Sequence, residues 1–143
     1  MGFSEDRASG RFGPFYFLIA ENPYVLWDAV ENWKRGWQGA PGATGPVPHV
    51  FTAPQIDYDR LRNLFATVPL FETLQLVVIE DVERVHEARH DELAAILRNL
   101  SSTTKVLLTS SDIDRRKTWY KTLASLGPVE VFPRIVLAAT CVW

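Results

Sequence analysis

The run LQLVVI at residues 74–79 is the most β-branched stretch of the chain, and it predicts a buried strand. Directly before it comes TVPLFE at residues 67–72, which follows an amphipathic helix pattern. Pro69 ends that helix, because proline donates no backbone N–H and keeps the preceding residue out of the helical region. Leu70 and Phe71 follow on the turn. Two large apolar residues on a short connection either complete a core or form a knob for a partner, and this choice largely decides the function.

Four further strand patterns lie on either side of this one. The five apolar runs of strand length are residues 15–20, 49–52, 74–79, 105–109 and 129–132. Four helix patterns separate them, with apolar residues at helical spacing. These residues are, in chain order, Leu26, Ala29, Val30, Trp33 and Trp37; Leu61, Leu64, Phe65 and Val68; Leu93, Ile96, Leu97 and Leu100; and Trp119, Leu123 and Leu126. The strict alternation predicts an α/β fold, in which helices flank a parallel five-stranded sheet through right-handed crossovers.

Capping residues predict where these helices begin and end. Side chains that accept hydrogen bonds are preferred just before a helix, and glycine is preferred just after one. The expected N-terminal caps are Asn22, Asp57 and Asp112, and the expected helix-ending glycines are Gly36, Gly39 and Gly127.

The chain length of 143 residues suits one domain. Residues 1–13 are polar and contain glycine, so we expect a flexible segment that lies outside the fold. Residues 14–135 form the expected α/β domain, and residues 39–48 (GAPGATGPVP) form its clearest loop. The apolar tail at residues 136–143 is either an extra packed element or the stub of a further domain.

Composition narrows the classes of partner. The formal net charge is −2, and no basic stripe is visible, so we expect no strong direct binding of nucleic acid. The single cysteine, Cys141, excludes an internal disulfide and fits a reducing compartment. No apolar run approaches the roughly 20 residues of a transmembrane helix, so we expect no membrane partner.

The carboxyl ends of parallel strands are where α/β proteins place their sites. After the first strand the chain reads AENPY at residues 20–24, which matches neither GxxxxGK[ST] nor GxGxxG and puts Glu21 where a phosphate would bind. We therefore expect no nucleotide cofactor there. After the third strand, Glu80 and Asp81 stand where a carboxylate can hold Mg²⁺ through water, although an acidic pair at a strand end is most often a solvated turn.

Other polar residues favour structural roles. His86 and His90 are four residues apart and could share a helix face as zinc ligands, but no HExxH pattern is present. We expect both to be exposed polar residues at a helix start, and we expect no metal site and no catalytic residue. The basic residues at 114–117 (DRRK) could touch phosphate, but they more simply form the charged outer face of a helix.

Several of these features together resemble the N-terminal domain of the delta subunit of the bacterial DNA polymerase III clamp loader. They are the first strand with the ENPY turn, the helix capped by Asp57, VPLF at residues 68–71 and the strand at residues 74–79. The resemblance runs from about residue 15 to residue 132. Ala20 stands where that family usually has glycine, which is a departure from its pattern.

The resemblance implies an AAA+-like, P-loop-NTPase-like domain without a functional P-loop, without a cofactor, and with strand order 5-1-4-3-2. It also implies that the domain binds the ring-shaped sliding clamp and helps to open it. Leu70 and Phe71 match the pair that plugs an apolar pocket of the clamp, and Val68 and Pro69 flank them. The protein would be a cytoplasmic, non-catalytic part of the bacterial DNA polymerase III holoenzyme. It would meet other clamp-loader subunits only through a lid-like and a collar domain, which this chain does not include.

Two alternatives stay open from the residues alone. The first is a small nucleotide hydrolase or phosphotransferase that uses Glu80 and Asp81 as magnesium ligands, and it predicts stabilisation by ATP or Mg²⁺. The second is a regulatory scaffold of the same fold whose partner surface is the apolar tail at residues 136–143.

Overall fold

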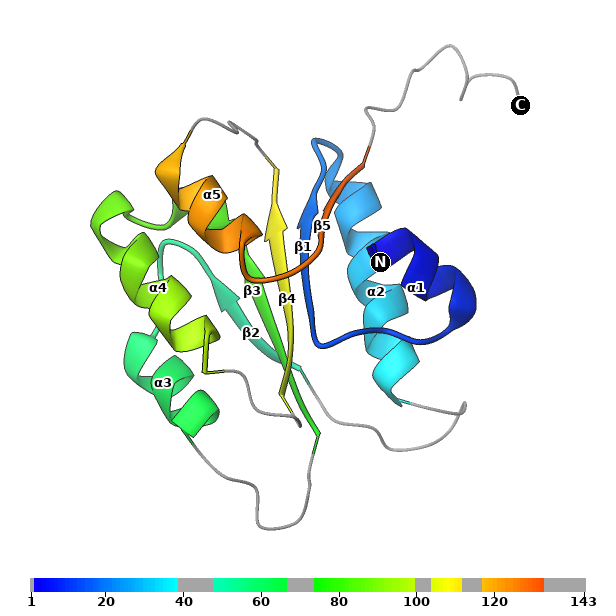
Figure 1. The fold of residues 1–143 in the computed structure, drawn as a ribbon, viewed down its shortest axis with the longest axis horizontal. Coiled ribbons are helices and arrows are strands. Elements are labelled where there is room, and N and C mark those ends of the chain that lie inside the picture. Colours follow the sequence, from blue (N-terminus) through cyan, green and yellow to red (C-terminus); the bar gives the residue numbers. More distant parts are fainter. Residues whose placement is uncertain (1, 39–47, 67–73, 100–103, 112–116, 133–143) are drawn as a thin grey trace.

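Five parallel strands form the sheet at the centre of the molecule (Figure 1). The structure, a computed structural model, describes residues 2–38, 48–66, 74–99, 104–111 and 117–132. The strands are β1 (Phe15–Ile19), β2 (His49–Thr52), β3 (Gln75–Glu80), β4 (Thr104–Ser110) and β5 (Val129–Val131). Their order across the sheet is β2-β3-β4-β1-β5, and every neighbouring pair is parallel. The parallel five-stranded fold and the order 5-1-4-3-2 are thus confirmed.

Helices cover both faces of the sheet (Figure 1). One face carries α1 (Phe3–Ser9) and α2 (Pro23–Gln38), and the other carries α3 (Tyr58–Ala66), α4 (His90–Leu97) and α5 (Thr118–Ala124). Two short 3-10 turns, η1 (Val82–Arg84) and η2 (Glu87–Arg89), connect β3 to α4. This segment is rich in charged residues, and it also buries Val82 and Val85 in the core.

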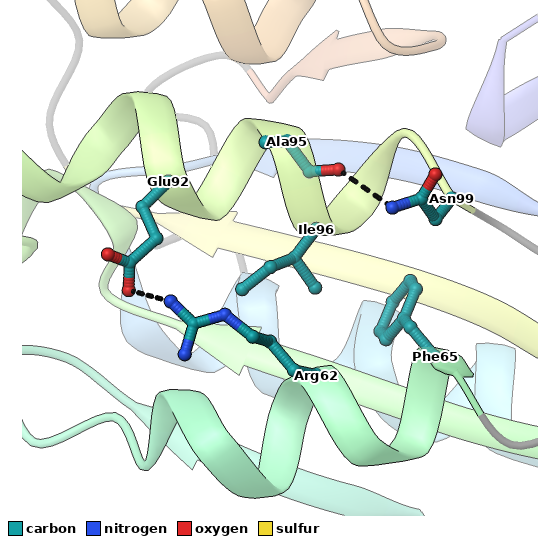
Figure 2. Close-up of a pocket in the computed structure, with 6 residues that line it drawn as sticks. All are labelled: Arg62, Phe65, Glu92, Ala95, Ile96 and Asn99. Atoms are coloured by element: carbon teal, nitrogen blue, oxygen red, sulfur yellow. Dashed lines mark hydrogen bonds and ion pairs between the residues drawn. The ribbon is translucent and has the colours of Figure 1, made fainter.

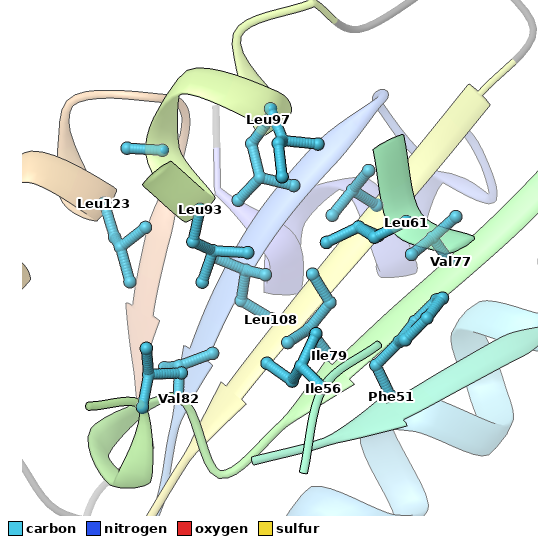
Figure 3. Packing of buried hydrophobic residues seen from close by; sticks show 14 of the residues in the cluster. Phe51, Ile56, Leu61, Val77, Ile79, Val82, Leu93, Leu97, Leu108 and Leu123 are labelled. Atoms are coloured by element: carbon cyan, nitrogen blue, oxygen red, sulfur yellow. The ribbon is translucent and has the colours of Figure 1, made fainter. Parts of the chain in front are cut away.

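Alternate residues of each strand supply two separate apolar clusters. Along β1, Phe15, Phe17 and Ile19 face α3, α4 and α5, whereas Tyr16 and Leu18 face α1 and α2. The larger cluster is seen in Figure 3, where Val77, Ile79 and Leu108 of the sheet lie against Leu61, Leu93, Leu97 and Leu123 of the helices. Because successive side chains of a strand point to opposite faces, a sheet covered on both sides needs the continuous apolar runs that the sequence contains.

Two predicted helix caps are present. The Asn22 Oδ1 atom accepts a hydrogen bond from the backbone N–H of Tyr24 at 2.9 Å, at the start of α2. The Asp57 Oδ1 atom accepts one from the backbone N–H of Arg60 at 3.0 Å, at the start of α3. Each bond satisfies one of the N–H groups that the first turn of a helix leaves unpaired.

The N-terminal segment corrects an expectation. Residues 1–13 were expected to lie outside the fold, but residues 3–9 form α1, which Gly10 ends in the left-handed conformation at φ 75°. Phe3 is fully buried, and its ring packs edge-on against Tyr16 at 5.2 Å between centroids. The Tyr16 hydroxyl donates to Asp6 at 2.5 Å. The segment is polar in composition, but two of its apolar residues, Phe3 and Phe12, pack on the apolar cluster that contains Tyr16.

Two glycines and one cap also differ from the expectation. Helix α2 continues through Gly36, where a Cβ atom would lie 2.4 Å from a ring carbon of Phe12, so this glycine permits close packing and does not end the helix. Gly127 lies three residues beyond the end of α5, against Phe15, which a Cβ atom would approach to 2.4 Å. Helix α5 begins at Thr118 with Lys117 at its N-cap position, so the predicted Asp112 cap is wrong.

Some sequence predictions concern residues outside the described part of the chain. They are Gly39, the residues of the turn at 68–71, Leu100, Asp112, most of the basic cluster at 114–117 and the tail at 136–143.

Replacing Phe3 by alanine is expected to lower the free energy of unfolding by about 3 kcal/mol, because a fully buried aromatic side chain is removed from an apolar cluster. Urea denaturation followed by circular dichroism measures this change. Ser4→Ala is the matched control, since the Ser4 side chain is exposed and its backbone N–H, which donates to Glu130, is kept. Equal stability of the two variants would contradict the packing of α1 on the sheet.

Candidate functional site

The residues predicted to bind a partner, Val68, Pro69, Leu70 and Phe71, lie outside the described residues. The structure describes the chain on either side of them. Helix α3 ends at Ala66, and β3 begins at Gln75. The elements that hold the two ends of this site are therefore α3 and β3.

Helix α3 is held to the rest of the molecule by its buried apolar side chains and by arginine side chains on its outer side. Leu61 is fully buried, and Phe65 is 7% exposed, both in the larger cluster. On the outer side, the Arg62 guanidinium lies 2.6 Å from a Glu92 carboxylate oxygen of α4. The Arg60 guanidinium lies 5.1 Å from the ring centroid of Phe51 in β2. These contacts hold the helix against both the sheet and α4, up to its last turn.

Strand β3 is equally constrained. It pairs with β2 on one side and with β4 on the other, and its four central residues are buried. The segment between Ala66 and Gln75 therefore starts and finishes on packed elements. Because β3 begins there, this connection belongs to the amino-terminal edge of the parallel sheet.

A groove lies between α3 and α4, with a volume of about 430 Å³ (Figure 2). Phe65, Ala95 and Ile96 make it apolar; the remaining lining residues are Arg62, Glu92 and Asn99. Figure 2 shows the Arg62–Glu92 ion pair at one end and Phe65 with Asn99 at the other. Phe65 stands next to the last residue of α3, so this end of the groove is adjacent in the chain to the predicted partner-binding residues.

Sequence reasoning did not find this groove. Its walls come from two helices that are about 30 residues apart in the chain, and only their packing brings Arg62 opposite Glu92. The available signal was weak, namely the charged residues at the outer positions of two amphipathic helices.

The carboxyl edge of the sheet carries the predicted acidic pair. Glu80 accepts a hydrogen bond from the Thr52 hydroxyl at 3.0 Å. Asp81 takes the left-handed conformation at φ 58° and begins η1, with its carbonyl accepting the Arg84 N–H at 2.8 Å. Among the residues that the structure describes, no three His, Cys, Asp or Glu side chains converge as metal ligands.

The first turn of α2, which could hold a phosphate in a nucleotide-binding protein, is capped by the chain itself. The Asn22 side chain accepts the hydrogen bond of the Tyr24 backbone N–H, which a bound phosphate would otherwise accept. Ser111, after β4, donates its hydroxyl to Glu83 at 2.8 Å. Asn22, Glu80 and Ser111 at this edge thus each bond to another residue of the chain, which fits the solvated-turn interpretation of Glu80 and Asp81.

The histidines do not form a metal pair. His90 is buried, contrary to the expectation that it is exposed, because its ring stacks on Trp119 at 5.2 Å. Its Nε2 atom lies 3.2 Å from the Val82 carbonyl. His86 is exposed, and its Nδ1 atom accepts the Ala88 N–H at 3.4 Å.

Some titrating groups beside α3 are shifted by their surroundings. The pKa of His49 is lowered by burial and by the charge of Arg60, whose guanidinium lies 3.1 Å from His49 Nδ1. Burial raises the pKa of Tyr58, which lies under the Arg89 guanidinium at 4.5 Å. Both residues are therefore uncharged at neutral pH.

A search of the part of the chain that the structure describes finds no helix long and apolar enough to cross a membrane.

Comparison with known proteins points to one family. The model of the family described as DNA polymerase III, delta subunit, matches residues 50–131, which is more than half of the chain. No curated protein matches the chain.

Solved structures support the same fold. The Bacillus subtilis DNA clamp loader delta protein is similar with a TM-score of 0.67 and 15% identity, over 96% of this chain and 43% of that one. A DNA polymerase III gamma subunit-related protein from Thermotoga maritima has a TM-score of 0.60 and 15% identity, over 98% and 48%. Thermotoga maritima RuvB has a TM-score of 0.54 and 8% identity, over 96% and 43%.

These likenesses support the AAA+-like fold class. The chain spans less than half of the length of each of these solved proteins.

Magnesium and ATP are expected to leave the melting temperature unchanged, because Asn22 caps the helix start where phosphate would bind. A ligand at 100 times its Kd stabilises a specific site by about 2.7 kcal/mol, which a thermal scan detects readily. The scan is run with and without both ligands on the wild type and on Glu80→Gln/Asp81→Asn. A rise in melting temperature that this variant abolishes would instead support the nucleotide hydrolase.

Proposed function

Because the chain belongs to the family of the DNA polymerase III delta subunit, we propose that it binds the sliding clamp and helps to open it, without hydrolysing ATP itself. The observation that carries this proposal is the family match over residues 50–131, which includes the Val68-Pro69-Leu70-Phe71 turn. This function places the protein in the bacterial cytoplasm, with the sliding clamp as its first partner.

The frame around the turn supports Leu70 and Phe71 as the clamp-binding pair. The connection from α3 to β3 starts after a helix packed through Leu61 and Phe65, and it ends on a strand paired on both sides. Side chains presented between two packed elements lose less freedom on binding than those on a long loop, and a proline in the connection lowers that cost further.

The energy available from this pair is sufficient for a specific interface. Burying a Leu or a Phe side chain stabilises by roughly 1.5–3 kcal/mol each. A few such residues in a partner's pocket usually dominate the binding free energy. Val68 and Pro69 are proposed to orient the pair, since proline restricts the backbone on both sides of the turn.

The carboxyl edge of the sheet is the reason that the proposal includes no ATP hydrolysis by this chain. At this edge the Asn22 side chain caps the start of α2, and the sequence there contains no glycine-rich phosphate-binding loop. Energy for opening the clamp is proposed to come from binding, with nucleotide hydrolysis left to other subunits. Contacts with those subunits are proposed only for the whole protein, because this chain spans less than half of the length of the solved clamp-loader proteins.

The double variant Leu70→Ala/Phe71→Ala is expected to weaken binding to the cognate sliding clamp by at least about 100-fold, because two buried apolar side chains are lost from the interface. Surface plasmon resonance with immobilised clamp measures the Kd, and circular dichroism checks that the variant stays folded.

The matched control is Tyr24→Ala/Trp27→Ala, which removes two exposed aromatic side chains from α2. It is expected to bind the clamp like the wild type. If the control loses binding while Leu70→Ala/Phe71→Ala keeps it, the clamp contact does not lie on the α3–β3 connection.

A further inference from the structure

An exposed aromatic pair stands at the start of α2. Tyr24 is 68% exposed and Trp27 is 56% exposed, and their ring centroids are 5.8 Å apart. Within the described residues, the large apolar side chains that are exposed comprise these two and Val50. Exposed aromatic residues of this size are enriched in protein interfaces, where they supply a large contact area at low cost in conformational entropy.

Trp27 forms one wall of a hollow of about 240 Å³ between α2 and the carboxyl ends of β3 and β4. Apolar side chains of α2 contribute to its lining, and charged side chains come from α2 and from the end of β3. The other lining residues are Pro23, Leu26, Val30, Glu31, Lys34, Glu80, Asp81 and Thr109.

The charges around this hollow leave an excess of negative charge. Lys34, its one basic lining residue, pairs with Glu31 at 3.3 Å. In the described part of the chain, the ion pairs include neither Glu80 nor Asp81. The hydrogen bond that Glu80 accepts from the described residues comes from a neutral hydroxyl, that of Thr52. Among the described residues, Glu80 and Asp81 thus line the hollow beside the Trp27 indole ring without an ion pair of their own, and the Lys34 ammonium in the lining is paired with Glu31.

This combination fits a cation. The face of an indole attracts a positive charge, and a carboxylate nearby adds a charge-assisted hydrogen bond. A guanidinium suits the arrangement better than an ammonium, because its plane stacks on aromatic rings while its N–H groups reach carboxylates.

The same charges argue against a nucleic acid or a nucleotide. Exposed aromatic residues can stack on bases, but such sites combine them with basic side chains that follow the phosphates. Here, Glu80 and Asp81 would repel a phosphate, and Asn22 already caps the nearby helix start.

We propose that Tyr24 and Trp27, together with Glu80 and Asp81, form a docking site for an arginine side chain presented by a protein partner. The site goes beyond clamp binding and uses a different surface. Helix α2 and the acidic pair follow the carboxyl ends of β1 and β3, whereas the connection from α3 enters the amino end of β3. The two surfaces lie at opposite edges of the sheet, so both partners can be bound at the same time.

The test uses the full 143-residue chain, labelled with ¹⁵N, and the blocked peptide acetyl-Gly-Arg-Gly-Arg-Gly-amide as the probe. The indole N–H signal of Trp27, assigned through Trp27→Phe, is followed by NMR during titration. A saturable shift is expected, and it should weaken with added salt because the arginine would pair with partly exposed carboxylates. Glu80→Gln/Asp81→Asn is expected to weaken binding by roughly tenfold or more, equivalent to the loss of one charge-assisted contact.

The matched control is Glu5→Gln/Asp91→Asn, which removes the same net charge from exposed positions on α1 and α4. It should bind the peptide like the wild type. Leu70→Ala/Phe71→Ala should also bind it normally, so failure of clamp binding and failure of this site are distinguishable.

Several outcomes would overturn the proposal. They are an unmoved Trp27 signal, equal binding by the Glu80/Asp81 variant and the wild type, or equal affinity for the same peptide with lysine in place of arginine. A saturable Trp27 shift with ATP or with a thymidine oligonucleotide would reassign the hollow to a nucleotide or a nucleic acid.

Discussion

The fold depends on the burial of β1 and β4 on both faces. Each strand is paired on both sides, β4 with β3 and β1, and β1 with β4 and β5. Their side chains are almost all buried, in two clusters that lie on opposite sides of the sheet. Two parallel strands cannot be joined by a tight turn, so the chain between them crosses one face of the sheet and forms a helix on that face. The positions of α2, α3, α4 and α5 follow from this requirement, whereas α1 precedes the first strand.

The same constraint separates the molecule into two functional edges. At the amino edge, the connection between α3 and β3 joins two fixed elements. Helix α3 is held by Phe65 and by the Arg62–Glu92 ion pair, and β3 is paired on both sides. At the carboxyl edge, where related folds bind phosphate, the Asn22 side chain and the Thr52–Glu80 hydrogen bond replace a phosphate cradle. Protein contacts at both edges are the proposed use of this sheet.

Helix α1 lies beside α2 on the same face of the sheet. Phe3 packs on Tyr16 of β1, and the Tyr16 hydroxyl bonds to Asp6 of α1 and to the backbone N–H of Gly13. Burial and the bond to Asp6 raise the pKa of Tyr16, so it stays a neutral donor. The absence of a side chain at Gly36 lets Phe12 approach α2 closely. The first part of the chain is therefore integral to the domain.

Local patterns in the sequence determined the strands, the four helices α2 to α5, the caps at Asn22 and Asp57, and the family, because each depends on residues that are near one another in the chain. The burial of Phe3 and His90, the roles of Gly36 and Gly127, and the groove between α3 and α4 were decided only by the tertiary structure. In each of these cases, the partner that gives the residue its role lies on another element. Periodicity reports which side of an element is apolar, but it does not report which other element covers that side.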